Sequence, residues 1–176
     1  LVAVVDIDSA LFSHDFRSTE KISQQLVQVS GRSGRKSENS EVIIQTRVPN
    51  HPLINELLAK GYANFSSKAL ENRKKTNLPP FSYLCLLRIS SAKKSTPVTI
   101  LDKITRKLTG DKNLKVLGPA PAPIIKKNNM YIYQLIIQSN NRKLLLQKST
   151  QIREYIVEKK INNIRWSLDI DPLDLY

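Results

Sequence analysis

The sequence predicts a mixed α/β protein in which a piece of a parallel, helix-covered sheet is followed by a small α+β sandwich. In the first part, two β-branched apolar runs flank a helical apolar pattern, the strand–helix–strand order of one right-handed crossover. In the second part, residues 81–171 alternate in the order βαββαβ, which predicts two helices packed on one sheet. The sequence Leu78-Pro79-Pro80 separates the two parts, because consecutive prolines interrupt regular structure.

The first part begins with a strand over residues 1–7. This run is apolar on both faces, which is typical of a buried strand in a parallel sheet. Because nothing precedes it, we expect its sheet partners to lie upstream of this sequence. Apolar residues at helical spacing then predict a helix over about residues 17–30 that ends at Gly31. A polar loop follows, and a second strand is predicted at 41–46.

Two helices are predicted between the strands and the proline break. Pro52 lies near the first position of a helix, where its missing N–H costs nothing, and Gly61 can end that helix. A second helix is predicted over about residues 62–75. We therefore divide the chain into three segments, which are residues 1–49, a helical linker at 50–79 and a C-terminal domain at 80–176.

The C-terminal domain begins with a strand at residues 81–90 that is apolar on both faces. A helix follows that is capped by Thr96-Pro97 and ended by Gly110. The remaining elements are a short strand at 114–117, a stiff proline-rich loop at 118–123, a strand at 130–138, a helix at about 141–159 and a half-buried strand at 164–171.

The charge of the chain is unevenly distributed. The chain has 176 residues and a net charge of +13. Residues 1–50 carry six basic and six acidic side chains, so the whole excess lies in residues 51–176. A strongly basic region indicates a polyanionic partner, nucleic acid before an anionic membrane surface. The alternative is a solubility effect in a lysine-rich proteome.

Several classes of protein are excluded by composition. A disulfide framework is impossible with Cys85 as the one cysteine, and one cysteine with two histidines argues against a structural zinc site made by this chain alone. No apolar run is long enough to span a membrane, and the N-terminal residues do not form a signal peptide. We therefore expect a cytoplasmic protein without a metal site of its own.

The strongest motif is Q-x-x-G-R-x-G-R, formed by Gln28, Gly31, Arg32, Gly34 and Arg35. Arginine is planar, bidentate and always charged, so it suits phosphate oxygens. Two arginines beyond a helix end fit arginine fingers, which stabilise charge on a transferred phosphoryl group and increase its rate of transfer by about a thousandfold or more. The alternative is a basic Gly/Ser loop that repeats G-R-x by chance.

This motif resembles motif VI of superfamily 2 helicases, and further stretches narrow the resemblance. The chain as a whole is similar to the C-terminal part of the replication-restart DNA helicases, the primosomal protein N′ family. The stretches that carry this similarity are Val5-Asp6-Ile7-Asp8, Asp15-Phe16-Arg17, His51-Pro52-Leu53, Leu78-Pro79-Pro80-Phe81, Leu117-Gly118-Pro119, Tyr133-Gln134 and Leu168-Asp169-Ile170-Asp171-Pro172.

The resemblance implies an ATP-driven 3′→5′ DNA helicase that recognises stalled replication forks and assembles the primosome. Residues 1–49 then match the end of the second RecA-like lobe, whose Gln28, Arg32 and Arg35 meet ATP. Residues 80–176 match an α+β domain that binds branched DNA. The implied partners are forked DNA, the single-stranded-DNA-binding protein and other primosome proteins.

Other features of the family are missing from this sequence. It has no G-x-x-x-x-G-K-[ST] loop to cradle phosphates and no Asp-Glu pair for Mg²⁺, and the zinc-binding cysteines of the full-length family are absent. We expect all of these upstream, so the chain alone should not hydrolyse ATP. The alternative hypothesis is a truncated, non-catalytic module that binds DNA or a partner protein.

Three further basic residues are candidate binding residues. Lys126 and Lys127 precede Tyr131 and Tyr133, a pattern that can combine phosphate contacts with base stacking, although a solvated hairpin with half-buried tyrosines explains it too. Arg142 begins a helix, where a cation opposes the helix dipole. The resemblance implies that Arg142 captures the acidic tail of the single-stranded-DNA-binding protein.

The remaining polar candidates are interpreted as structural. The aspartates at 6, 8, 169 and 171 lie at strand ends, where turn and cap roles are common. His14 and His51 lack a catalytic partner at suitable spacing. Cys85 alternates with apolar neighbours along a strand, which predicts a small buried side chain.

Overall fold

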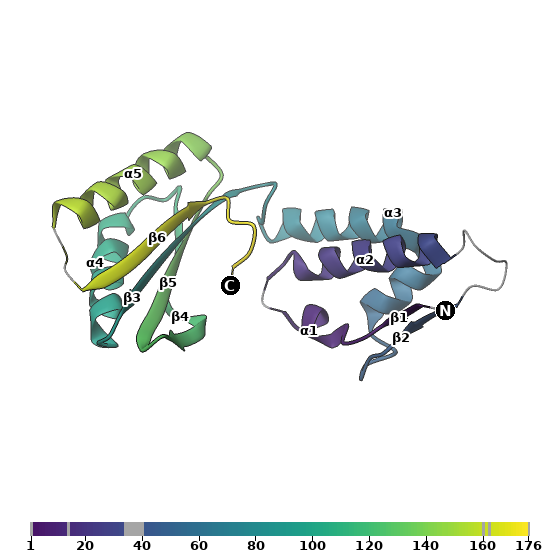
Figure 1. Ribbon diagram of the computed structural model, residues 1–176. Coiled ribbons are helices and arrows are strands. Elements are labelled where there is room, and N and C mark those ends of the chain that lie inside the picture. Colours follow the sequence, from purple (N-terminus) through teal and green to yellow (C-terminus); the bar gives the residue numbers. More distant parts are fainter. Residues whose placement is uncertain (1, 14, 34–40, 160, 162, 176) are drawn as a thin grey trace. The chain divides into compact units, whose positions relative to one another are not determined.

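The structure is a computed structural model that describes residues 2–13, 15–33, 41–159, 161 and 163–175, with backbone only for residues 32 and 33 (Figure 1). It contains two compact units, Leu1–Lys75 and Thr76–Tyr176. One unit holds a parallel two-stranded sheet and the other an antiparallel four-stranded sheet, so the mixed α/β class is confirmed. Within the described residues, no helix is long and apolar enough to cross a membrane.

Unit 1 has the predicted strand–helix–strand order. Its elements are β1 (Val2–Val4), α1 (Asp8–Leu11), α2 (Ser18–Ser33), β2 (Val42–Ile44) and α3 (Pro52–Lys75). Strands β1 and β2 pair in parallel, which requires a crossover and explains why a helix lies between them in the chain. The short helix α1 was not expected from the sequence.

The core of unit 1 joins α2 and α3 to the end of β1. Its buried side chains are Ile7, Leu26, Ile54, Leu57 and Phe65. The Phe65 side chain is only 2% exposed, and burial of this kind contributes roughly 2–3 kcal/mol. The two halves of α3 meet at Gly61, whose φ of 73° is not helical. The predicted break at Gly61 is therefore confirmed.

The start of α2 is fixed by local contacts and by α3. The Asp15 carboxylate is buried and accepts a hydrogen bond from the backbone N–H of Arg17 at 3.0 Å. The guanidinium groups of Arg17 and Arg73 lie 4.2 and 4.9 Å from the Phe16 ring centroid. Arg73 of α3 also forms an ion pair with Glu20 of α2. These contacts connect the start of α2 to the end of α3.

The predicted end of the helix at about residues 17–30 was wrong. Helix α2 continues through Gly31 and Arg32 to Ser33, so Gly31 lies in the last turn of the helix and not beyond it. Gly31 is absent from the glycines with positive φ. A helical glycine costs only about 1 kcal/mol relative to alanine, which a short extension of a packed helix tolerates.

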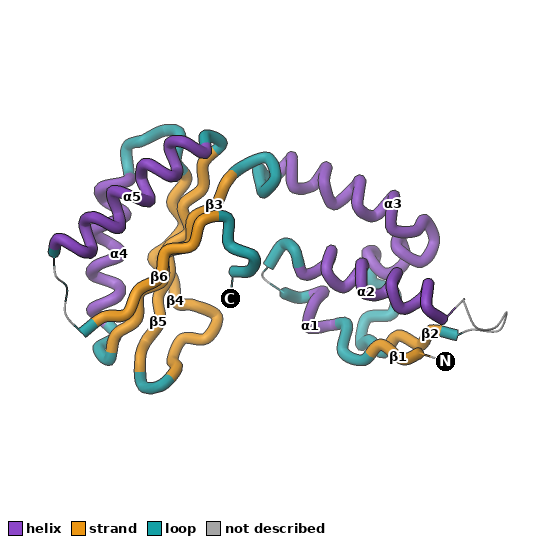
Figure 2. The backbone as a smooth tube through the Cα atoms, turned by 45° about the horizontal axis from the view of Figure 1, so that its top comes forward, coloured by secondary structure: helices purple, strands orange, loops and turns teal. Residues whose placement is uncertain are grey.

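Unit 2 is the predicted βαββαβ sandwich. Its elements are β3 (Tyr83–Ser91), α4 (Ser95–Leu108), β4 (Lys115–Lys127), β5 (Met130–Ser139), α5 (Arg142–Glu158) and β6 (Ile164–Ile170). The strands form one antiparallel sheet in the order β4-β5-β3-β6. Figure 2 shows both helices on one side of this sheet.

The core of unit 2 lies between the helices and the sheet. Its completely buried members include Cys85, Leu87, Leu101, Leu135 and Leu145. Strand β3 is central and largely buried on both faces, whereas β6 is an edge strand that alternates between half-buried and exposed residues. Both burial patterns agree with the predictions. Helix α4 begins at Ser95, one residue before the predicted cap, and its N-cap residue Lys94 makes no capping hydrogen bond from its side chain.

The prediction for β4 was wrong in extent. The proline-rich segment is part of a strand that continues to Lys127, with irregular register between Leu117 and Ala120 and again between Pro121 and Lys126. An edge strand tolerates prolines because one side of its backbone has no ladder partner. Gly118 has a φ of 114°, and a Cβ there would lie 2.8 Å from the carbonyl oxygen of Gln134. This close approach of β4 to β5 requires glycine.

Candidate functional site

The motif VI residues lie at the end of α2. Gln28 and Gly31 are exposed there. Among the described residues, no atom lies within 4 Å of a Cβ built at Gly31, so the packing of unit 1 does not require a glycine. The Arg32 side chain and the whole of Arg35 lie outside the described residues.

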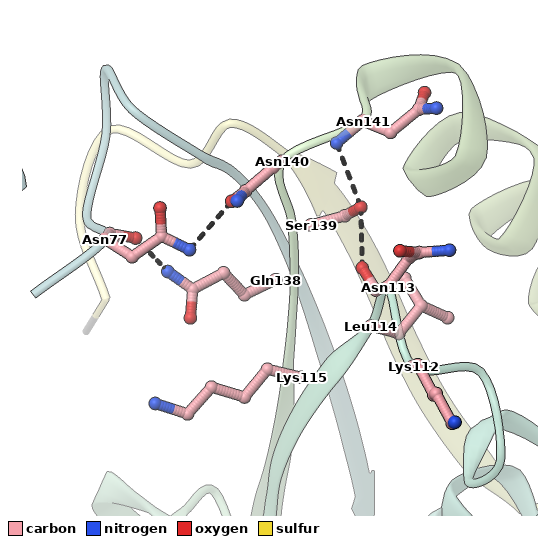
Figure 3. Close-up of a pocket in the computed structure, with 9 residues that line it drawn as sticks. All are labelled: Asn77, Lys112, Asn113, Leu114, Lys115, Gln138, Ser139, Asn140 and Asn141. Carbon is pink, nitrogen blue, oxygen red and sulfur yellow. Dashed lines mark hydrogen bonds between the residues drawn. The ribbon is translucent and has the colours of Figure 1, made fainter.

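A cavity of about 410 Å³ lies at one end of the sheet of unit 2 (Figure 3). Three separate segments form its walls, and they are the segment before β3, the α4–β4 turn with the start of β4, and the end of β5 with the β5–α5 turn. The lining residues are Asn77, Lys112, Asn113, Leu114, Lys115, Gln138, Ser139, Asn140 and Asn141.

Hydrogen bonds hold these segments together. The Asn77 side-chain amide donates to Asn140 Oδ1 at 2.7 Å, and the Gln138 amide donates to the backbone carbonyl of Asn77. The Ser139 hydroxyl donates to the backbone carbonyl of Asn113 at 3.0 Å. The segment before β3 and the α4–β4 turn are therefore both tied to the end of β5, so the cavity is largely pre-formed.

The chemistry of the cavity suits an anion. Its lining contains two lysines, five amide side chains and no carboxylate. Figure 3 shows Lys115 on the same side of the strand as Gln138 and Asn77, in agreement with the pairing of Lys115 with Gln138. Within the described part of the chain, Lys112 and Lys115 have no carboxylate at ion-pair distance. Ammonium groups and amide N–H donors are suitable partners for phosphate or carboxylate oxygens.

Arg142 is the first residue of α5 and comes directly after Asn141, which lines the cavity. Its guanidinium lies 3.6 Å from Asp171 Oδ2 and 5.8 Å from the Tyr83 ring centroid. The other oxygen of Asp171 accepts the backbone N–H of Leu84 at 3.3 Å, so the carboxylate is held in place. The Arg142 side chain remains 59% exposed. Asp171 therefore orients Arg142 and offsets the unfavourable position of a cation at a helix start.

The lysines of the β4–β5 hairpin are at the opposite end of the sheet. Lys126 Nζ lies 5.1 Å from the Tyr131 ring centroid, and both Lys126 and Lys127 are exposed. Tyr133 is only 7% exposed and Tyr131 packs against the edge of the core. The interpretation of the tyrosines as half in the core is confirmed.

The residues interpreted as structural have structural partners. His51 Nδ1 accepts the backbone N–H of Leu53 at 3.2 Å, at the start of α3. Burial raises the pKa of the Cys85 thiol to about 11. The Thr46 hydroxyl and then the Arg47 backbone N–H lower the pKa of Asp8. His14 lies outside the described residues. Among the described residues, no group of three or more His, Cys, Asp or Glu side chains could hold a metal ion.

The sequence prediction did not include the cavity, although one signal could have found it. Residues 112–153 contain eight basic side chains and no acidic one. This run begins in the cavity wall and includes the whole of β4 and β5. A search of the sequence for long segments without acidic residues would have placed Lys112 and Lys115 in the same basic segment as Lys126 and Lys127.

Comparison with known proteins identifies the family. The sequence model of the family described as the C-terminal domain of primosomal protein N matches residues 74–173. Replication restart protein PriA of Haemophilus influenzae is 39% identical over 180 residues, which cover 99% of this chain and 24% of that protein. The corresponding proteins of Bacillus subtilis and Synechocystis sp. are 33% and 34% identical over 98% and 99% of this chain.

The chain spans about a quarter of the length of these relatives. The family match covers more than half of the chain, and it includes all of β3 to β6 and the cavity. The chain therefore belongs to the family of replication restart protein PriA.

Proposed function

We propose that this chain is the C-terminal portion of an ATP-dependent 3′→5′ DNA helicase that restarts replication at stalled forks in the cytoplasm. Residues 1–49 are the end of the second RecA-like lobe, residues 50–79 are a helical linker, and residues 80–176 bind branched DNA. The observation that carries the proposal is family membership, combined with exposed lysines at both ends of the sheet in unit 2 that have no ion-pair partner among the described residues.

The proposed role of the motif VI segment is to meet ATP that upstream domains hold. Gln28, Arg32 and Arg35 approach the nucleotide, and Gly31 lets the surfaces come close. The exposure of Gln28 and the open space around Gly31 support this role, because neither residue is needed for packing within unit 1. The arginines then stabilise negative charge on the transferred phosphoryl group.

The nucleotide site is incomplete without upstream domains in this proposal. In unit 1, the Asp8 carboxylate already accepts hydrogen bonds from Thr46 and Arg47, so it is poorly suited to Mg²⁺. We therefore assign phosphate binding, Mg²⁺ ligands and the structural zinc sites to the upstream domains. This chain supplies the arginines and, by itself, no ATP hydrolysis.

The proposed partners of unit 2 are anionic. Lys126 and Lys127 contact the phosphates of a forked DNA. Arg142 binds the acidic tail of the single-stranded-DNA-binding protein, and its exposure and its fixed orientation by Asp171 support this assignment. Other primosome proteins assemble on the same complex. A second candidate function is a non-catalytic DNA- or partner-binding module, which the confinement of the whole charge excess to residues 51–176 favours.

Fluorescence anisotropy with a labelled DNA fork tests the proposal. A linear duplex of equal length and charge is the control, and both are measured at two salt concentrations. Tighter binding to the fork supports a branched-DNA domain within this chain. Equal binding with a steep dependence on salt would refute it, since charge alone would then explain the affinity.

A further inference from the structure

The lysines of β4 differ from two other basic residues of the acid-free run, Arg142 and Lys148. Arg142 and Lys148 of α5 lie 3.6 and 3.8 Å from the carboxylates of Asp171 and Asp111. Lys115, Lys126 and Lys127 have no such neighbour among the described residues, and neither does Lys112 just before the strand. The edge of β4 therefore carries uncompensated positive charge at both ends.

We infer that edge strand β4 is a track for the sugar–phosphate backbone of duplex DNA. Lys112 and Lys115 each contact one phosphate group near the cavity, and this pair is the first anchor; Lys126 and Lys127 each contact one at the hairpin, and this pair is the second anchor. The inference rests on the proposed DNA-binding function and assigns where the backbone contacts lie and how far apart they are.

The register of the sheet sets the distance between the two anchors. Lys115 pairs with Gln138 and Lys127 pairs with Met130, so the anchors are separated by eight residue steps along β5. At about 3.3 Å per residue this separation is about 26 Å. Duplex DNA rises about 3.4 Å per base pair, so the anchors are about seven or eight base pairs apart along the duplex.

The composition of the edge favours DNA over a peptide. A peptide that adds a strand to a sheet edge needs free backbone N–H donors there. Three prolines interrupt β4, and its register is irregular in two places, so a continuous ladder of hydrogen bonds cannot form on this edge. The lysines at its ends need only phosphate oxygens at the correct spacing.

The test measures the salt dependence of fork binding by the whole 176-residue chain. Two double variants, Lys112→Gln with Lys115→Gln and Lys126→Gln with Lys127→Gln, each remove one anchor. Each should reduce the slope of log K against log salt concentration by about 1.8, because a phosphate contact on duplex DNA contributes about 0.9. Circular dichroism confirms that the variants are folded.

A charge-matched control variant distinguishes specific contacts along β4 from a general effect of net charge. The double variant Lys103→Gln with Arg153→Gln removes the same charge from exposed positions of α4 and α5 and should keep the original slope. A fork with duplex arms of about five base pairs is shorter than the anchor spacing. On this fork, the unaltered chain should show the reduced slope of a double variant, since only one anchor can be occupied.

The possible results test the β4 track and the proposed fork-binding function independently of each other. Equal slope losses in the control and in both β4 variants would overturn the track. Unchanged slopes in both β4 variants, with fork preference retained, would overturn the track alone. An unaltered chain without preference for the fork would refute the fork-binding function, while the slopes would still decide whether β4 contacts the backbone.

Discussion

Gly118→Ala should be the most destabilising small substitution in unit 2. The new Cβ would lie 2.8 Å from the Gln134 carbonyl oxygen and 3.1 Å from the Ala120 nitrogen, and both atoms belong to the backbone. Backbone atoms in a sheet cannot rotate away, so β4 must separate from β5. The residue also has a φ of 114°, which costs an L-residue about 1–3 kcal/mol.

We expect a total loss of about 2–6 kcal/mol, because backbone strain and overpacking each cost about 1–3 kcal/mol. For a domain of this size, a loss of 1 kcal/mol lowers the melting temperature by about 4–8 °C, so the predicted fall is at least about 8 °C. Thermal unfolding followed by circular dichroism, supported by urea titration, measures it.

Two other glycines provide matched controls. Gly110 has a φ of 116° but open space around a Cβ, so Gly110→Ala incurs the backbone strain without the clash. Gly31 has neither a positive φ nor a neighbour, so Gly31→Ala should be neutral or stabilise by up to about 1 kcal/mol. If Gly118→Ala loses no more stability than Gly110→Ala, the close approach of β4 to β5 at Gly118 does not restrict this position to glycine.

Three further predictions follow from single side chains. Burial raises the pKa of Cys85 to about 11, above its ordinary value of 9.0. The stability from its neutral thiol is therefore complete below pH 9 and is lost as the pH rises toward 11; urea unfolding across this range should show a fall that Cys85→Ala lacks. Hydrogen bonds lower the pKa of Asp8, so Asp8→Asn should destabilise the chain at neutral pH. That difference should disappear as acid protonates the carboxylate, and equal losses at both pH values would contradict the assignment. When upstream domains are supplied, Arg32→Ala or Arg35→Ala should reduce ATP hydrolysis about a thousandfold or more, and normal rates in a phosphate-release assay would reject the finger role.

The sequence predicted most elements because their signals are local. The helical stripe of α4 and the alternation in β6 are periodic patterns that depend only on which face is buried. The breaks at Gly61 and before β3 follow from backbone chemistry that any context would respect. Cys85 and His51 could be interpreted correctly because the sequence offered neither of them a reactive partner.

The errors concern the extents of two elements, α2 and β4. Glycine often ends a helix, but α2 continues through Gly31, because glycine also adopts helical φ and ψ at a cost of only about 1 kcal/mol. The proline-rich segment was assigned to a loop because prolines disfavour strands, but at a sheet edge β5 holds it in place. The position of β4 at the edge of the sheet decided the extent of this strand.

By itself, the sequence determined the fold class, the βαββαβ order, the uneven charge and the family, because these follow from patterns along the chain. Only the tertiary structure decided that three separate segments meet in one cavity, and that the two lysine anchors lie at opposite ends of an edge strand. Strand order and register bring distant residues together, and they are set by the packing of the whole sheet and not by any single segment.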